Sequence, residues 1–249
     1  MTDSRIATIA DGPFDDGFAL MDALDPAWAA LCRRMASDPW VSGVLPRRTV
    51  ELVGLAVNAA CTNLNAEGTR RHIRGALAAG ATRAEILLVI KMASLLSIHS
   101  CSLGAPILLE EAAAAGAPLP ARTPAPAAPV SDAMRAKGMW NDAWDPFFAL
   151  DPAWTDAFMA AGVGVYAGGV FEPKLAELLS IAFDASITHM YAPGTRRHIR
   201  AALSHGATVA EIMEVLKLCV VQGVQAANMA LPILAEELDR AGSATETRT

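Results

Sequence analysis

The chain has 249 residues, of which 53% are hydrophobic and 18% are charged, and its formal net charge is −6. This length fits one large domain or two small ones, and the acidic balance without a basic stripe argues against a nucleic-acid partner. The N-terminal sequence lacks the basic and apolar regions of a secretory signal. No uninterrupted apolar run reaches the roughly 18–20 residues of a membrane-spanning helix. We therefore expect a cytoplasmic protein with no membrane partner.

Helix signals follow one another along the chain. The dipeptide DP at residues 25–26 is typical of an N-cap followed by proline in the first turn. A long apolar helix is expected over residues 49–64, and another over residues 69–80, closed by a glycine. TRAE at residues 82–85 is a capping box that opens a further apolar helix, and APILLEE at residues 105–111 begins the last one. No segment alternates with a period of two, so the chain is predicted to be all-α.

The same signals occur twice, which identifies a tandem repeat. GTRRHIR occurs at residues 68–74 and again, 126 residues later, at residues 194–200, and ALDPAW occurs twice with the same offset. From residue 68 to 86, 15 of 19 positions are identical to those of the second copy. A repeat of this kind decides the architecture before any single residue is considered.

A segment rich in proline and alanine separates the copies, and such a composition is typical of a semi-rigid linker. We expect a first repeat over residues 1–115, a linker over residues 116–138 and a second repeat over residues 139–249. The four cysteines, Cys32, Cys61, Cys101 and Cys219, form no CxxC pair and are expected to be reduced and mostly buried.

A polar stripe is predicted on the apolar helix over residues 49–64. At 100° per residue, four polar residues fall within roughly 60° of one another: Glu51, Asn58, Thr62 and Asn65. The second repeat has four polar residues at the same positions: Glu177, Asp184, Thr188 and Tyr191. Because burying polar groups costs free energy unless they are hydrogen-bonded, the stripe faces either a ligand site or another polar element of the protein.

The repeated string places a histidine at the edge of an apolar helical face, His72 in the first repeat and His198 in the second. A histidine can exchange protons near neutral pH, as general acid–base catalysis requires. The alternative is a structural histidine that bonds to a nearby carbonyl. The arginines Arg70, Arg71 and Arg74 are expected to bind carboxylates, at a subunit contact, on the surface or on an anionic substrate.

The repeats differ at further candidate positions, since His99 corresponds to Gln225 and Asn63 corresponds to His189. The two sites are therefore not equivalent. A metal site formed by the first repeat's glutamate and its two histidines would lack ligand pairs spaced three or four residues apart, so no metal is predicted.

The segments RRHIRGALAAGATRAEI and RRHIRAALSHGATVAEIMEVLK, with the later stretch GVQAANMALPIL, resemble the carboxymuconolactone decarboxylase family. The resemblance implies a helical bundle in each repeat and a homo-oligomer, here a trimer of tandem chains. It also implies a cofactor-independent lyase, acting in aromatic compound catabolism on a small carboxylate or lactone-type substrate. Proton transfer by a histidine in an apolar pocket would then drive decarboxylation.

The predicted site follows from the resemblance and the stripe together. The predicted catalytic residues are His198, His72, Glu177 and Glu51. The predicted substrate-binding residues are Asp184, Thr188, Tyr191, His189, Asn58, Thr62, His99 and Gln225. We expect the histidine to work in one repeat only, and the second repeat is favoured because it offers more proton donors and acceptors.

Other functions remain open from the sequence. The same residues would serve an isomerase, a retro-aldol lyase or a lactone hydrolase, and the divergence between the repeats favours a non-catalytic ligand-binding or scaffold protein. Thiol peroxidases of the same superfamily use a CxxC pair. Here Leu64 stands where a cysteine partner of Cys61 would be, which argues against that activity.

Overall fold

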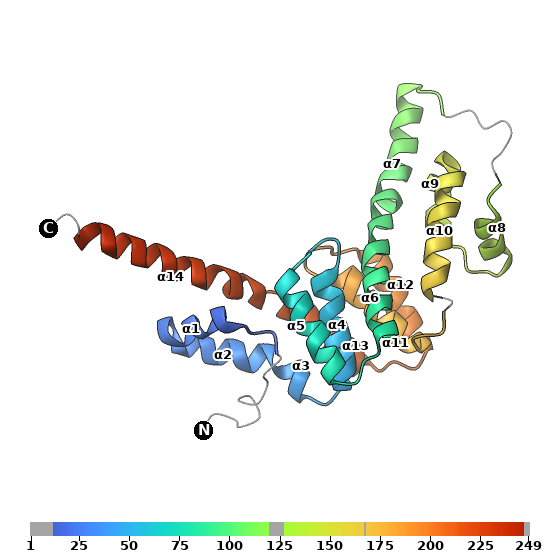
Figure 1. Cartoon of the computed structure of the whole chain (residues 1–249). Coiled ribbons are helices and arrows are strands. Elements are labelled where there is room, and N and C mark those ends of the chain that lie inside the picture. Colours follow the sequence, from blue (N-terminus) through green and yellow to red (C-terminus); the bar gives the residue numbers. More distant parts are fainter. Residues whose placement is uncertain (1–11, 120–126, 167, 247–249) are drawn as a thin grey trace. The chain divides into compact units, whose positions relative to one another are not determined.

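The computed structural model describes residues 12–119, 127–166 and 168–246, and every regular element in these ranges is a helix (Figure 1). The first half holds α1 (Ala19–Leu24), α2 (Pro26–Ala36), α3 (Asp38–Val41), α4 (Arg47–Ala59), α5 (Ala66–Ala78), α6 (Arg83–Leu95) and α7 (His99–Ala115). The second half holds α8 (Pro129–Ala136), α9 (Asp145–Leu150), α10 (Pro152–Tyr166), α11 (Pro173–Ala185), α12 (Ala192–Ser204), α13 (Val209–Val221) and α14 (Val224–Glu246). Three short 3-10 helices are η2 (Asp16–Phe18), η3 (Leu96–Ile98) and η4 (Asp142–Trp144). The predicted all-α fold is confirmed.

The tandem repeat is visible in the helices and in their caps. Helices α4, α5 and α6 recur as α11, α12 and α13 with the 126-residue offset of the sequence. Asp25 and Asp151 each cap a helix by accepting a hydrogen bond from the backbone N–H three residues later, both at 3.0 Å. The capping box of Thr208 and Glu211 is present, as the sequence predicts.

The helix that carries the predicted polar stripe is shorter than expected. Because α4 ends at Ala59, and α11 at the equivalent residue, Thr62 and Asn65 follow the helix and do not lie on its face. Leu64 and Met190 adopt positive φ angles of 52° and 54°, which reverse the chain into the next helix. Nothing in the sequence signals this turn, since leucine and methionine rarely adopt that conformation.

Two further expectations about helix boundaries are wrong. The last helix of each repeat begins well before its proline, so Pro106 and Pro232 lie inside α7 and α14. A proline inside a helix removes one backbone hydrogen bond, and each of these long helices continues on both sides of its proline. Part of the predicted linker forms α8, which begins at Pro129 as proline in a first turn allows. Residues 120–126 of the linker lie outside the described residues.

The compact units of the chain are not the sequence repeats. One unit contains the chain up to Ile90 together with the chain from Phe171 onward, and the other contains residues 91–170. In the first unit α4 packs against α5 and α11, and α11 packs against α12 and α13. Its fully buried side chains come from both repeats and include Leu52, Leu55, Leu178, Ile181 and Val215.

The terminal helices of each repeat pack with those of the other. In the first unit, η2 and α2 share a core with the end of α13 and the start of α14: Phe18, Ala29, Cys32, Ala36, Val221 and Val224. In the second unit, α7 shares a core with α8, α9 and α10: Ala105, Met134, Phe147 and Met159. The repeats are therefore intertwined, and the predicted boundaries at residues 115 and 139 describe the sequence rather than these units.

The cysteines are free, as expected, but only two of them are buried. Cys32 and Cys219 are buried, Cys101 is partly buried and Cys61 is exposed. Burial raises the pKa of the Cys219 thiol to about 12, which makes it unreactive.

Two helical segments, Arg83–Ala115 and Val209–Ala241, are long and apolar enough to cross a membrane by length and composition alone. No uninterrupted apolar run in the sequence is long enough to cross a membrane. These two segments are apolar only on average, because charged residues such as Lys91 and Lys217 interrupt them. The core helices of soluble proteins have the same properties, and the second segment contributes Val221 and Val224 to the core of the first unit. These segments are therefore weak support for a membrane protein.

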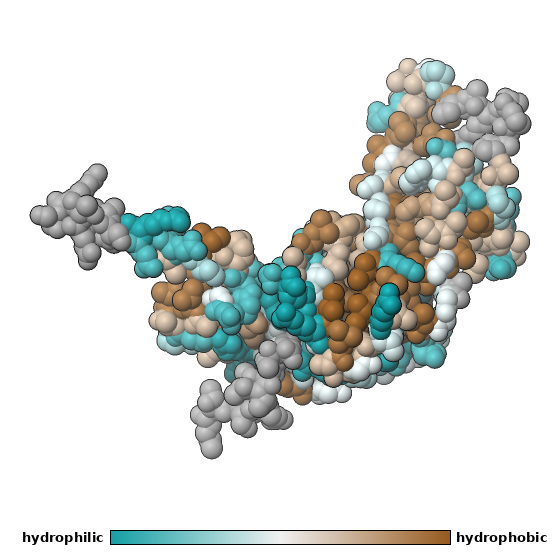
Figure 2. Space-filling view, viewed as in Figure 1, coloured by the Kyte–Doolittle hydropathy of each residue, from teal (hydrophilic) through white to brown (hydrophobic). Residues whose placement is uncertain are grey.

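Apolar side chains are exposed at equivalent positions of α7 and α14. Leu103 and Ile107 on α7 correspond to Met229 and Ile233 on α14, and each is about half exposed or more. Other apolar side chains reach the surface on the face shown in Figure 2. A surface of this kind is typical of protein–protein contacts.

Candidate active site

A glutamate and a histidine pair in each repeat. In the first repeat, Oε2 of Glu51 lies 2.8 Å from Nδ1 of His72, and in the second, Oε2 of Glu177 lies 2.6 Å from Nδ1 of His198. The glutamate comes from α4 or α11, and the histidine comes from the next helix, α5 or α12. The four predicted catalytic residues thus form two equivalent pairs. A carboxylate at Nδ1 orients the ring and leaves Nε2 as the atom that can meet a substrate.

The first pair is fully enclosed by its neighbours. Oε1 of Glu51 accepts hydrogen bonds from Nε1 of Trp40 at 2.9 Å and from Nε of Arg47 at 2.7 Å. The Trp40 ring stacks on the His72 ring with centroids 6.1 Å apart. Three donors satisfy this buried carboxylate and tie α4 to α5 and to Trp40. This environment fits a structural pair.

The second pair is more open. Pro173 stands where the first repeat has Arg47, and His198 is the one hydrogen-bond partner of the Glu177 carboxylate among the described residues. The side chains of Glu177 and His198 are 19% and 10% exposed, whereas those of Glu51 and His72 are 0% and 3% exposed. The second pair can therefore meet a small molecule more readily than the first.

Two glycines explain why the first pair lies deeper. A Cβ atom at Gly54 would lie 2.5 Å from the histidine Nδ1, and one at Gly75 would lie 2.5 Å from the glutamate carboxyl carbon. Since real Cβ contacts are longer, only glycine leaves this space free. The second repeat has Ser180 and Ala201 at these positions. Their side chains occupy this space, so Glu177 and His198 lie closer to the surface than the first pair does.

The second repeat also places an acid beside the other ring nitrogen. Oδ2 of Asp184 lies 3.6 Å from Nε2 of His198, and Nη2 of Arg197 lies 2.9 Å from the same nitrogen. Burial raises the pKa of Asp184 to about 7, partly opposed by Arg197 and reinforced by the charge of Glu177. A carboxyl group with this pKa can donate and accept protons near neutral pH. The first repeat has Asn58 here, whose amide donates to a backbone carbonyl at 2.8 Å and supplies no acid.

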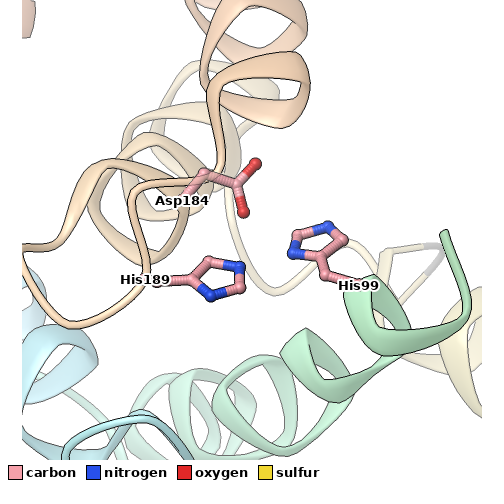
Figure 3. Close-up of side chains that lie close together, drawn as sticks. All are labelled: His99, Asp184 and His189. Atoms are coloured by element: carbon pink, nitrogen blue, oxygen red, sulfur yellow. The ribbon is translucent and has the colours of Figure 1, made fainter. Parts of the chain in front are cut away.

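The turn before α12 arranges the polar groups around Asp184. The backbone N–H of Tyr191 donates to the Asp184 carbonyl at 2.7 Å, and the carboxylate packs against Gly194, which has no side chain to displace it. Figure 3 shows the side chains of Asp184 and His189. A carboxylate oxygen of Asp184 and a ring nitrogen of His189 lie within 4.8 Å of each other. Loss of hydration lowers the pKa of His189. The rings of His189 and Tyr191 are 5.7 Å apart.

The other predicted substrate-binding residues lie elsewhere. The hydroxyl oxygens of Thr62 and Thr188 are 3.1 Å apart and share a hydrogen bond. Gln225 belongs to the second repeat but accepts a hydrogen bond at 3.4 Å from Asn65, in the first. His99 is the first residue of α7, in the second compact unit.

Residues that the sequence does not single out close the first site. The carbonyl oxygen of Pro13 accepts hydrogen bonds from Nη1 of Arg71 at 3.0 Å, from Nδ2 of Asn228 at 2.9 Å and from Nε2 of Gln225 at 3.5 Å. Oδ2 of Asp15 lies 3.4 Å from Nη2 of Arg71. The segment before η2 therefore occupies hydrogen-bond donors that would otherwise be available to a ligand of the first site. The sequence carries one signal for it: Asp15 is acidic, whereas its counterpart in the second repeat, Asn141, is neutral.

Comparison with known proteins identifies the family. The model of the carboxymuconolactone decarboxylase family matches residues 24–97 and 152–236. A crystal structure of a protein assigned as a gamma-carboxymuconolactone decarboxylase subunit, from Burkholderia xenovorans LB400, is similar with a TM-score of 0.84 and 33% sequence identity. That similarity covers 96% of this chain and 98% of the other. No curated protein matches the chain. With both repeats matched and nearly the whole chain aligned, the chain belongs to the carboxymuconolactone decarboxylase family.

Proposed function

We propose that the chain is a cofactor-independent lyase that decarboxylates a small carboxylate or lactone-type substrate at the site of the second repeat. The surroundings of His198 carry the proposal. Its Nδ1 atom is held by Glu177 at 2.6 Å, and its Nε2 atom lies 3.6 Å from Asp184, an acid with a pKa of about 7. These groups support proton transfer near neutral pH, and membership of the family supports decarboxylation as the reaction.

In the proposed step, the bond between the carboxylate and its neighbouring carbon breaks, and CO₂ leaves. The electron pair of that bond passes into the adjacent conjugated carbonyl system as an enolate. His198 then delivers a proton from Nε2 to the carbon, and Asp184 returns a proton to the ring. Each turnover consumes one proton, which Asp184 regains from solvent.

The first repeat supports a structural role instead. Glu51 accepts hydrogen bonds from three donors, and Asn58 stands where the second repeat has Asp184. The Pro13 carbonyl accepts a hydrogen bond from the neighbouring Arg71. A site tuned for one transition state needs its own set of donors and acceptors, and the first repeat lacks them. We therefore assign turnover to the second repeat.

We also propose a cytoplasmic homo-oligomer, most simply a trimer of tandem chains. The exposed apolar side chains of α7 and α14 support it, because such surfaces are usually buried between subunits. The equivalence of the exposed positions on the two helices suits a symmetric assembly.

The experiment uses the full chain and gamma-carboxymuconolactone, the compound in the name of the similar crystal structure. We expect one CO₂ released per substrate consumed, without added cofactor and in the presence of a chelator. Substrate loss without CO₂, with a ring-opened acid as product, would replace the proposal by a lactone hydrolase. If none of a panel of lactone acids is consumed, the chain is a binding or scaffold protein.

A further inference from the structure

Helix α12 carries an exposed face of two arginines and a leucine. Arg196, Arg200 and Leu203 are spaced i, i+4 and i+7, which places them within about 60° of one another around the helix. All three side chains are exposed. The two arginines make no ion pair within the described part of the chain. These three residues are called the arginine face below.

The first repeat pairs the equivalent arginine with an acid on the same helix. Nε of Arg70, the counterpart of Arg196, lies 3.8 Å from Oε2 of Glu67. In the second repeat Pro193 stands where the first has Glu67, in the first turn of α12, where proline is favoured. The arginine face therefore lacks the carboxylate that pairs with Arg70.

Helix α7 carries an exposed face of the opposite charge. Leu103, Ile107 and Glu110 have the same spacing of i, i+4 and i+7, and Glu111 lies beside them. All four side chains are exposed. Neither glutamate makes an ion pair among the residues that the structure describes. These four residues are called the acidic face below.

The second repeat pairs its own glutamates with an arginine. On α14, Nη2 of Arg240 lies 3.6 Å from Oε2 of Glu236, and the same guanidinium pairs with Glu237. Ala114 stands at the position of Arg240 in the first repeat, so the acidic face has no such partner. Each repeat thus lacks one ion pair that the other has, and the charges left unpaired on α12 and α7 are opposite in sign.

The spacing of charged and apolar residues also matches between the two faces. Arg200 precedes Leu203 by three residues, and Glu110 follows Ile107 by three residues. In an antiparallel pair of helices, Arg200 would therefore lie opposite Glu110 when Leu203 lies opposite Ile107. Contact between the apolar side chains would exclude water beside the ion pair, which strengthens the attraction between the charges.

We propose that the arginine face of one chain binds the acidic face of a second copy of the same chain. The second copy is the occupant because it offers both the complementary charge and the matching spacing. Since the two faces differ, the contact is head to tail, and such contacts close into a ring when their rotation allows it. The proposal rests on the proposed homo-oligomer and names the surfaces that hold it together.

The test measures the mass of the full chain by analytical ultracentrifugation at micromolar concentration. Arg196→Glu combined with Arg200→Glu should raise the dissociation constant of the assembly at least about tenfold, because like charges then face each other. Glu110→Arg combined with Glu111→Arg should do the same. All four changes in one chain reverse both faces, restore the attraction and should restore the wild-type mass.

A matched control separates this contact from a general effect of charge. Arg34 and Arg83 are also exposed and make no ion pair within the described residues. Arg34→Glu combined with Arg83→Glu changes the net charge by the same amount and should keep the wild-type mass. Every variant should show the helical circular dichroism of the wild type, which distinguishes lost assembly from misfolding.

Mixing the two reversed variants tests whether the contact joins different chains. Each variant repels itself, but each reversed face is complementary to the reversed face of the other variant. An equimolar mixture should therefore contain species that hold both variants and are larger than either variant forms alone. A mixture that stays at the masses of the separate variants would contradict a contact between chains.

The outcomes also separate this inference from the proposed function. An oligomeric wild type whose mass is unchanged by either reversal, or is not restored by all four changes in a folded chain, would overturn the two faces and keep the homo-oligomer. A single-chain mass in the wild type would overturn both. Release of CO₂ from the lactone is measured independently and decides the lyase.

Discussion

The hydroxyls of Thr62 and Thr188, which occupy the same position in the two repeats, hydrogen-bond to each other at 3.1 Å. Equivalent positions can meet in this way only beside a local two-fold axis, as in the isologous interface of a dimer. The packing of α4 against its own counterpart α11 agrees with this axis. The two sites of the first unit therefore share one backbone frame, and their differences follow from side chains.

The two histidines should contribute unequally to turnover. General acid–base catalysis by one side chain is typically worth about 10²–10⁴-fold. We expect His198→Ala to lower kcat by at least about 100-fold relative to His72→Ala, measured as CO₂ release. His72→Ala should instead act on stability, because it removes a buried partner of Glu51. Equal losses of kcat in two folded variants would mean that both sites work.

Replacing Asp184 by the residue of the first repeat should stabilise the protein and inactivate it. The pKa of Asp184 is raised from 3.8 to about 7, so the folded state binds its proton more tightly than the unfolded state does. Wild-type stability should therefore fall as pH rises from about 4 to about 7, and Asp184→Asn should lack that loss. Above pH 7 the variant should be more stable by on the order of a few kcal/mol, measured by urea unfolding.

The pH dependence separates this effect from a general change of packing. At pH 4 to 5 the difference between Asp184→Asn and the wild type should be small, since Asp184 is then protonated. A difference of the same size at pH 5 and pH 8 would contradict the raised pKa. Wild-type turnover should also decline above about pH 7, because Asp184 then loses the proton that it returns to His198.

The sequence predicts the fold well because its signals are local. The capping box at Thr208 and the N-cap at Asp25 each depend on residues within a few positions of one another, and the repeat is found by comparing the sequence with itself. The turn at Leu64 is not predicted, since its positive φ has no signature in the residue itself. Because α4 ends at Ala59, before this turn, Thr62 does not lie on the predicted stripe.

The site is predicted less completely because its contacts are distant in sequence. Glu and His are kept 21 residues apart in both repeats, a regularity that signals their pairing. The contact of Pro13 with Asn228 spans 215 residues and joins the start of one repeat to the end of the other. No local pattern reports such a contact.

The exposed cysteine should be dispensable. Cys61 has no cysteine partner, and its counterpart in the second repeat is Ile187. We expect Cys61→Ser and Cys101→Ser to keep CO₂ release within about tenfold of the wild type, which corresponds to roughly 1.4 kcal/mol of barrier. A loss of several hundredfold with the fold intact would restore a thiol mechanism.

The chain should assemble in solution. The apolar positions exposed on α7 and α14 are costly to leave in water, so we expect a homo-oligomer, most simply a trimer. Light scattering at micromolar concentration should give about three times the 26.1 kDa of one chain. Replacing Met229 and Ile233 by glutamate should lower this mass. A single-chain mass in the wild type would refute the assembly.

The glycine that lets Glu51 lie against α5 should not tolerate alanine. A Cβ atom at Gly75 would lie 2.5 Å from the Glu51 carboxyl carbon, and that carboxylate is fixed by Arg47 and His72. Overpacking of this kind costs about 1–3 kcal/mol, which exceeds the gain of up to about 1 kcal/mol in helix propensity. Gly75→Ala should therefore lower the urea midpoint.

Gly104 on α7 provides the matched control. A Cβ atom there would meet nothing within 4 Å, so Gly104→Ala should raise the midpoint through helix propensity alone. The opposite signs of the two changes test whether the depth of the first pair depends on its glycines. If Gly75→Ala stabilises the protein as Gly104→Ala does, Glu51 can move outward as Glu177 does. The difference between the pairs would then have to arise from Trp40 and Arg47, which the second repeat lacks.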